Sequence, residues 1–203
     1  MVLAARRADD LAALAQELGG ESHALAVRCD VSEWDDVQAL AAAALDHFGR
    51  IDVVFANAGF GANRGFLNES VEHWRSMILT NVLGVALTIR ATLPHLLERG
   101  DGHYVLTSSV AGRRTIPGSL YGATKCAVTG IGQNLRAELR QDHPEAAVRV
   151  TLIEPGGVET PFFDNPGSGR LEPEDIARAV MYAVDQPAHV DVNEMLILPI
   201  AQP

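Results

Sequence analysis

The chain has 203 residues, of which 47% are hydrophobic, and this length and composition fit one globular domain with a substantial core. It carries 26 acidic side chains against 16 basic ones, and the net charge of −10 argues against a general surface for nucleic acid or other polyanions. Two cysteines, Cys29 and Cys126, supply neither a disulfide framework nor metal-ligand spacing, and we interpret both as small buried residues. The N-terminal apolar run is too short for a signal peptide and no uninterrupted stretch reaches membrane-spanning length, so we expect a cytoplasmic protein without a membrane partner.

Apolar runs alternate with helical patterns along the whole chain. Strands are predicted at 1–5, 23–28, 51–56, 103–107, 148–153 and 194–198. Helices are predicted at 9–18, from Ser32 as N-cap to Phe48, at 70–97 with a bend or early end at Pro94, at 121–141 and at 173–185. This alternation predicts an α/β fold with one doubly wound parallel sheet and no internal domain boundary.

Polar or turn-forming residues follow the ends of five predicted strands. They are Arg6, Asp30, Asn57, Ser109 and Pro155. In a doubly wound sheet, ligands bind at the carboxyl ends of the strands. The pattern therefore predicts one ligand cleft lined by these positions.

Tyr121 and Lys125 lie four residues apart in a helical pattern, so both side chains lie on one face of the helix. An ammonium beside a phenol favours the anionic form, which lowers the phenol pKa and suits it to proton transfer near neutral pH. A nearby serine hydroxyl can hydrogen-bond a carbonyl or alkoxide oxygen. Together these groups suit carbonyl/alcohol interconversion with a cofactor hydride. Taken alone, such a pair is more often a half-buried tyrosine beside a solvated lysine, and the rest of the chain must decide.

Four motifs occur in a fixed order along the chain. They are Asn57-Ala58-Gly59, Asn81-x-x-Gly84, Ser109-x-x-Gly112 with Tyr121-x-x-x-Lys125, and Pro155-Gly156-x-Val158-x-Thr160. This set resembles the short-chain dehydrogenase/reductase family and spans nearly the whole chain. The resemblance implies a single Rossmann-like domain that binds a nicotinamide dinucleotide and a small carbonyl or alcohol substrate.

The resemblance also implies a role for each catalytic residue. Tyr121 is the acid/base, and Ser109 orients the substrate oxygen, so both contact substrate. Lys125 lowers the tyrosine pKa and holds the nicotinamide ribose, while Asn81 completes a proton relay through water. The family's usual spacing between serine and tyrosine would select Ser108, whereas the Ser-x-x-Gly context selects Ser109, and we follow the context.

Cofactor contacts follow from the same resemblance. Arg6 stands where NADP-preferring members pair an arginine with the 2′-phosphate, which favours NADP(H) over NAD(H), although a solvated arginine at a helix start is the alternative. Asp30 and Val31 would contact the adenine, with helix capping an alternative for Asp30. The remaining predicted contacts are with the adenosine ribose (Asn57, Ala58, Gly59), the nicotinamide ribose (Tyr121, Lys125) and the nicotinamide (Pro155, Gly156, Val158, Thr160).

The loop 162–171 would lie over the substrate, and Phe162-Phe163 would give it an apolar wall suited to a small molecule. The two long helices at 70–97 and 121–141 would pack into the four-helix interface of a homodimer or homotetramer, as in the family. The seven histidines are scattered, and we expect no metal site.

The family pattern begins with a strand and a glycine-rich turn, TGxxxGxG, before the position of Arg6, whereas this sequence starts at the second strand. We therefore expect an N-terminally truncated domain without the first strand–helix unit, with a rearranged sheet as the alternative. The missing strand would sit in mid-sheet, so the first two strands would lack a neighbour. The leading hypothesis is an NADP(H)-dependent oxidoreductase. Its rival is an inactive remnant that acts only through its fold or an interface.

Overall fold

The computed structural model describes residues 1–63, 65–116, 120–160, 162 and 169–202. Every paired strand is parallel, and the strands form two sheets. The smaller sheet contains β1 (Val2–Ala5) and β2 (Leu25–Arg28). The larger has the order β3 (Val53–Ala56), β4 (Asp101–Thr107), β5 (Ala147–Pro155) and β6 (Glu194–Ile197).

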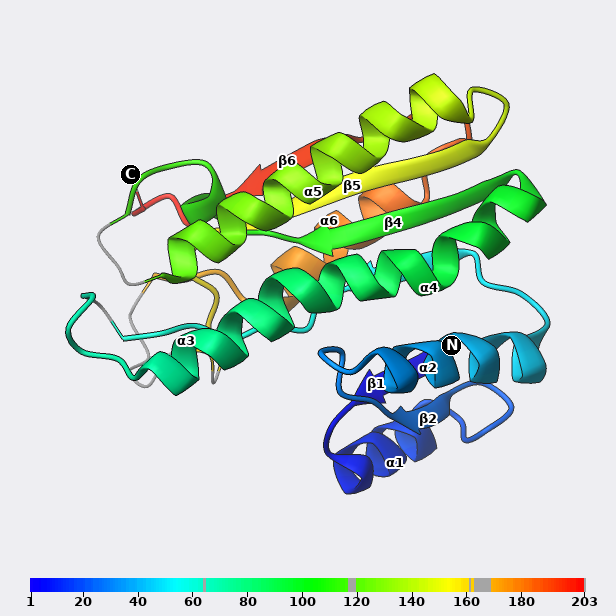
Figure 1. The fold of residues 1–203 in the computed structure, drawn as a ribbon, viewed down its shortest axis with the longest axis horizontal. Helices are drawn as coiled ribbons and strands as arrows, with labels where there is room; N and C mark the ends of the chain where they lie inside the picture. Colours follow the sequence, from blue (N-terminus) through cyan, green and yellow to red (C-terminus); the bar gives the residue numbers. More distant parts are fainter. Residues whose placement is uncertain (64, 117–119, 161, 163–168, 203) are drawn as a thin grey trace.

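Helices alternate with these strands and cover both faces of the larger sheet, so the predicted doubly wound α/β class is confirmed (Figure 1). Helices α4 and α5 lie on one face, and α6 lies on the other. The helices are α1 (Ala8–Glu17), α2 (Trp34–Phe48), α3 (Val71–Ile78), the π-helical turn η1 (Leu79–Leu83), α4 (Gly84–Arg99), the 3₁₀ turn η2 (Val110–Gly112), α5 (Tyr121–Asp142) and α6 (Pro173–Val184).

The sheet is divided where the sequence predicts a missing neighbour. In the described chain β1 pairs with β2 alone and β3 pairs with β4 alone, so each presents one unpaired edge. Two large apolar side chains of β3 are consequently exposed, Val53 at 41% and Phe55 at 47%. Strands β1 and β2 pair with each other, and within the described residues neither joins the larger sheet.

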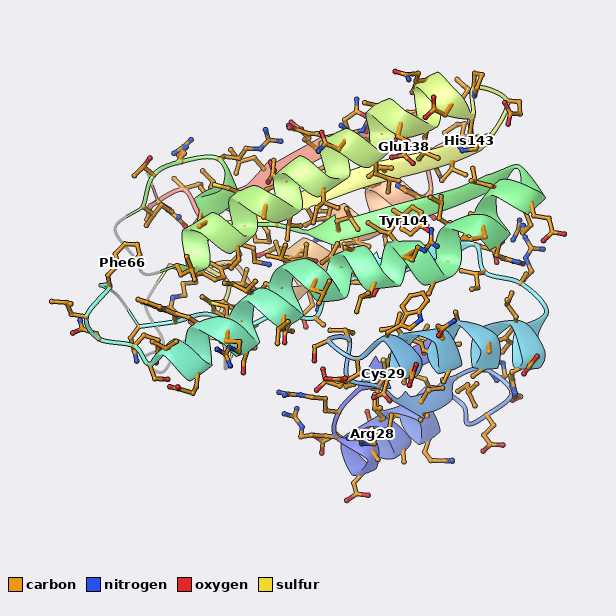
Figure 2. All side chains as sticks on the ribbon, viewed as in Figure 1. Arg28, Cys29, Phe66, Tyr104, Glu138 and His143 are labelled. Carbon is orange, nitrogen blue, oxygen red and sulfur yellow. The ribbon has the colours of Figure 1, made fainter. Side chains whose placement is uncertain are left out.

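The main core lies between the larger sheet and helices α4 and α5. Tyr104 on β4 is fully buried there, and its hydroxyl lies 2.8 Å from the Thr92 hydroxyl of α4 (Figure 2). Helix α5 approaches β5 closely because Gly132 has no side chain; a Cβ there would lie 2.8 Å from Leu152 Cδ2. This packing fixes α5, and therefore Tyr121 at its first turn, relative to the strand ends.

The long predicted helix is present but differs in two respects. It begins where expected, with the Ser70 hydroxyl accepting from His73 N at 3.1 Å. Pro94 was expected to bend or shorten it, yet α4 runs through that residue to Arg99 and ends at Gly100, whose φ is 79°. The fully buried Leu96 beyond the proline keeps the last turn on the core. The π-helical turn around Asn81 was not predicted.

The same helical stretch, Val71–Arg99, is long and apolar enough to cross a membrane, with a mean hydropathy of 1.5 and 33% of the apolar window buried. The sequence prediction considered only uninterrupted apolar runs, and it missed this stretch because charged residues interrupt it. Core helices meet the same criterion, so it is weak evidence for a span. Helix α4 packs against α2, β3 and β4, and we assign it to the core.

Two local predictions were wrong. Ser32 does not cap α2, because its hydroxyl donates to Asp30 Oδ1 at 2.7 Å, and the helix starts after Glu33 without a side-chain cap. Cys29 is buried as expected, whereas Cys126 is exposed. Its neighbours Thr124 and Lys125 take the buried face of α5 instead.

Candidate active site

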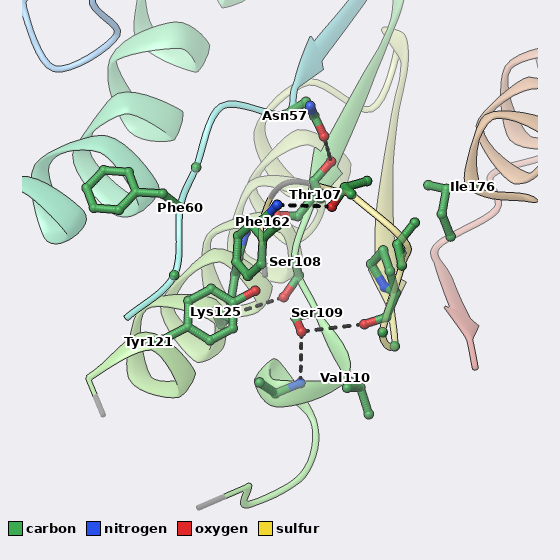
Figure 3. A pocket seen from close by; sticks show the side chains of 18 of the residues that line it. Asn57, Phe60, Thr107, Ser108, Ser109, Val110, Tyr121, Lys125, Phe162 and Ile176 are labelled. Carbon is green, nitrogen blue, oxygen red and sulfur yellow. Dashed lines mark hydrogen bonds between the residues drawn. The ribbon is translucent and has the colours of Figure 1, made fainter. Parts of the chain in front are cut away.

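Tyr121, Lys125 and Ser109 converge at the carboxyl end of β4 (Figure 3). Helix α5 starts at Tyr121 and presents both of its predicted catalytic side chains to the strand end. Lys125 Nζ donates to the Thr107 carbonyl at 2.8 Å and lies 5.9 Å from the centroid of the Tyr121 ring. The spacing of four residues thus places the two side chains together, as predicted.

The two adjacent serines differ in what they contact. Ser109 Oγ accepts from Ala111 N at 3.1 Å, which fixes the start of η2, and its hydroxyl lies close enough to the Tyr121 phenol to lower the pKa of that group. Ser108 turns towards α5, where its hydroxyl donates to the Lys125 carbonyl at 2.9 Å and lies 2.8 Å from Thr129 Oγ1. The geometry therefore favours Ser109, the choice made from the motif, as the serine beside the phenol.

The charge states of the site follow from burial. Lys125 is only 5% exposed, and desolvation of its ammonium lowers its pKa to about 8. Burial raises the pKa of Tyr121, and the hydrogen bond with Ser109 offsets this only in part. The predicted lowering of the tyrosine pKa by Lys125 is therefore wrong for this structure. The phenol is therefore protonated at neutral pH and has a proton to donate, while burial alone makes it a weaker acid than an ordinary tyrosine.

Asn81 lies immediately behind the site, in the π-helical turn, and is 1% exposed. Its Oδ1 accepts from Phe60 N at 3.0 Å, and its Nδ2 donates to Phe60 O at 2.9 Å and to Thr124 Oγ1 at 3.1 Å. These bonds fix the segment after β3 against α5. The water relay predicted for Asn81 stays a prediction; the contacts show a side chain that holds this segment in place.

A cavity of about 1510 Å³ lies beside these groups, and most of the predicted site residues line it. Those that line it are Asn57, Gly59, Ser109, Tyr121, Lys125, Pro155, Gly156, Val158 and Thr160. Asn57 is fixed at its edge because its Oδ1 accepts from Thr107 Oγ1 at 2.9 Å. Three strand ends, those of β3, β4 and β5, therefore meet at one cavity, as the doubly wound pattern predicts.

Besides Asn81, four predicted residues do not line this cavity: Arg6, Asp30, Val31 and Ala58. Arg6 and Asp30 follow β1 and β2, close enough that the Arg6 charge helps to lower the Asp30 pKa after the larger effect of the Ser32 hydrogen bond. Asp30 Oδ1 accepts from Ser32 N and Ser32 Oγ, so it caps a local turn rather than α2. Val31 packs on α4, where a Cβ at Gly84 would lie 2.7 Å from Val31 Cγ2.

Phe162 lines the cavity beside Tyr121, and the prediction that it contacts substrate stays a prediction. Its ring meets the Tyr121 ring edge-on, with centroids 5.6 Å apart, and a Cβ at Gly61 would lie 2.9 Å from Phe162 Cζ. Phe163 lies outside the described residues.

Sequence reasoning missed Phe60 and Thr107, which also line the cavity. The position of Thr107 immediately before the serine pair was the available signal.

A buried ion pair behind Ser109 was also missed. Glu154 on β5 is 1% exposed, and Arg113 Nε donates to its Oε1 at 2.6 Å. The other arm of Arg113 pairs with Glu194 of β6. Burial raises the Glu154 pKa and Arg113 opposes that rise. The signal was one acidic residue between the apolar pair Leu152-Ile153 and Pro155. Within the described residues, no three His, Cys, Asp or Glu side chains are placed to hold a metal ion.

Parallel strands with helices on both faces, and a Ser–Tyr–Lys group at the strand ends, define a Rossmann-like α/β protein. The family model for short chain dehydrogenase matches residues 1–170. An uncharacterized oxidoreductase of Staphylococcus epidermidis is 38% identical over 204 residues, covering 98% of this chain and 86% of the relative. The chain therefore belongs to the short-chain dehydrogenase family and is an oxidoreductase by class.

Solved structures give the same result. Serine dehydrogenase from Escherichia coli superposes with a TM-score of 0.88 at 34% identity, over 100% of this chain and 87% of that one. The alcohol dehydrogenase from the archaeon Thermococcus sibiricus, complexed with 5-hydroxy-NADP, gives a TM-score of 0.85 at 32% identity, over 100% and 86%.

Proposed function

We propose that this protein is an NADP(H)-dependent oxidoreductase that interconverts a carbonyl compound and a secondary alcohol. The observation that carries the proposal is the convergence of Ser109, Tyr121 and Lys125 on the wall of one cavity, beside the strand-end segment that starts at Pro155. When bound, the cofactor would supply the hydride that the carbonyl carbon needs. Tyr121, which is protonated at neutral pH, supplies the proton to the oxygen.

Ser109 and Lys125 support this proton transfer. The Ser109 hydroxyl lies beside the phenol and can donate to the same substrate oxygen, which orients the carbonyl. Lys125 places a buried ammonium in the cavity wall, where its charge stabilises hydroxyls of a bound ribose and negative charge that develops on oxygen. Asn81 keeps the Phe60 backbone, and with it the wall after β3, at a fixed distance from α5.

The residues present fit a dinucleotide. Gly59 lines the cavity, and a Cβ there would lie 3.0 Å from Asn81 Oδ1, so glycine lets this part of the wall pack closely on Asn81. Lys125 and the Pro155–Val158 segment line the same cavity. Two arginines follow β1, and the alcohol dehydrogenase of Thermococcus sibiricus is complexed with an NADP derivative. These features support NADP(H) as the cofactor, with NAD(H) as the comparison.

Titration of the chain with NADPH and NADH, followed by cofactor fluorescence, tests this proposal. We expect saturable binding that favours NADPH. Arg6→Ala should weaken NADPH about tenfold or more and leave NADH nearly unchanged, because a guanidinium pairs with the 2′-phosphate that only NADPH carries. Arg75→Ala, on the exposed face of α3, is the matched control. Absence of binding to either cofactor would favour the rival hypothesis of an inactive fold.

We also propose that the protein is a homodimer or homotetramer assembled through the long helices, as the family resemblance implies. Three large apolar side chains on or beside the π-helical turn are exposed, at 42% for Ile78, 37% for Leu79 and 39% for Leu83. Burial of these side chains against a second copy would stabilise the assembly. Light scattering should give at least twice the mass of 21.7 kDa, and a monomer alone would contradict the proposal.

A further inference from the structure

The segment after β5 that forms one wall of the cavity is held from two sides. Gly156 N donates to the Ile197 carbonyl at 2.7 Å, which continues the β5–β6 ladder by one residue beyond β5. On the opposite side, Leu171 N donates to the Gly157 carbonyl at 2.9 Å, and Val158 bridges to Leu171. The backbone of this wall is thus part of a short sheet-like arrangement rather than a free loop.

The next donor along this segment, Gly157 N, pairs with a side chain instead of a backbone carbonyl. After β6 the chain turns at Pro199, and Gln202 N donates to the Pro199 carbonyl at 2.9 Å. This turn brings the Gln202 side chain back towards β5, where Gln202 Oε1 accepts from Gly157 N at 2.8 Å. The side-chain amide oxygen therefore takes the place of a peptide carbonyl as the hydrogen-bond partner of Gly157 N.

The turn after β6, at Pro199 and Gln202, packs closely against the wall that follows β5. A Cβ at Gly156 would lie 2.8 Å from Pro199 Cδ and would also overlap Gln202 Oε1. Only glycine allows the turn after β6 to approach the wall this closely. Gln202 itself lines the cavity, together with Gly156 and Gly157.

We propose that Gln202 is a positioning residue that fixes the Gly156–Val158 wall where it meets the nicotinamide end of the cofactor. This inference rests on the proposed function for the part that concerns the cofactor. The hydrogen bond from Gly157 is a property of the protein alone. Because Gln202 acts on one end of the cavity, it should affect the nicotinamide half of the ligand and leave the adenosine half unaffected.

The first test is amide hydrogen exchange at Gly157, measured by NMR in three variants. Gln202→Ala removes the acceptor, and exchange should accelerate about tenfold. Gln202→Glu keeps an acceptor oxygen at the same reach and should retain the protection. Gln186→Ala is the matched control, because the Gln186 side chain bonds the Tyr182 carbonyl of α6 and lies outside the cavity. Unchanged exchange in Gln202→Ala would overturn the proposal.

The second test compares NADPH with 2′,5′-ADP, which lacks the nicotinamide. Gln202→Ala should weaken NADPH about threefold to tenfold and leave 2′,5′-ADP unchanged, with recovery in Gln202→Glu. Equal weakening of both ligands would show a general structural effect and would overturn the positioning role. If the unmodified chain binds neither ligand, the proposed function fails, and the exchange comparison alone then decides whether Gln202 holds the wall.

Discussion

Tyr121→Phe should lower the rate of carbonyl reduction about 10²- to 10⁴-fold, the usual contribution of a positioned general acid. The variant removes the proton donor and leaves the ring, so the edge-on contact with Phe162 is kept. Ser109 still accepts from Ala111 N, so the start of η2 should not move. The affinity for NADPH should change by less than about tenfold, since at most one neutral hydrogen bond is lost. Turnover of small carbonyl substrates is followed by NADPH absorbance, and affinity by cofactor fluorescence.

The matched control is Tyr104→Phe. Tyr104 is also buried and its hydroxyl is also hydrogen-bonded, to Thr92, but it lies in the core away from the cavity. This variant should lose about 1 kcal/mol of stability and keep its turnover. If both variants are equally active, Tyr121 is not the acid. If both lose activity together with their folded signal in circular dichroism, the effect is structural and the assignment of Tyr121 is also contradicted.

The sequence predicts the fold well because the period of apolar residues is a local property. The continuous apolar run of β3 and the amphipathic pattern of α1 need no long-range information, and both appear within a few residues of their predicted bounds. The ends of helices differ from the predicted ones where contacts with distant parts of the chain determine them. Packing of Leu96 on the core carries α4 past Pro94, and hydrogen bonding of Ser32 to Asp30 displaces the start of α2.

Spacing along the sequence predicts which side chains meet at the site, whereas the direction predicted for the tyrosine pKa is wrong. Helical geometry alone places Tyr121 and Lys125 together, and the strand-end rule brings Ser109 to them. The direction of the tyrosine pKa depends on how completely the surrounding segments exclude water, which no short motif records. Gln202 was missed for a related reason: its partner Gly157 lies 45 residues away in sequence, and only the turn at Pro199 brings them into contact.

The Arg113–Glu154 pair lies directly behind the site, and removal of its cation should give the largest loss of stability. In Arg113→Met the Glu154 carboxylate, 1% exposed, is left without its cation, which typically costs about 3–5 kcal/mol. Thr129 remains as a weak partner, with its hydroxyl 3.4 Å from Glu154 Oε1. Urea unfolding near neutral pH measures the loss. Arg178→Met is the matched control, since the Arg178–Asp175 pair is at the surface and should contribute less than about 1 kcal/mol.

The pH dependence of the free energy of unfolding of Arg113→Met distinguishes a loss caused by the unpaired Glu154 charge from a loss of packing. Burial already raises the Glu154 pKa above its ordinary value, and the loss of Arg113 raises it further. A group whose pKa is higher in the folded state binds more protons there, so the free energy of unfolding of Arg113→Met should increase as the pH falls below neutral. Adding Glu154→Gln to Arg113→Met should restore most of the stability at neutral pH, because no buried charge then lacks a partner. A loss that is independent of pH and is not relieved by Glu154→Gln would show that Arg113 acts through packing alone.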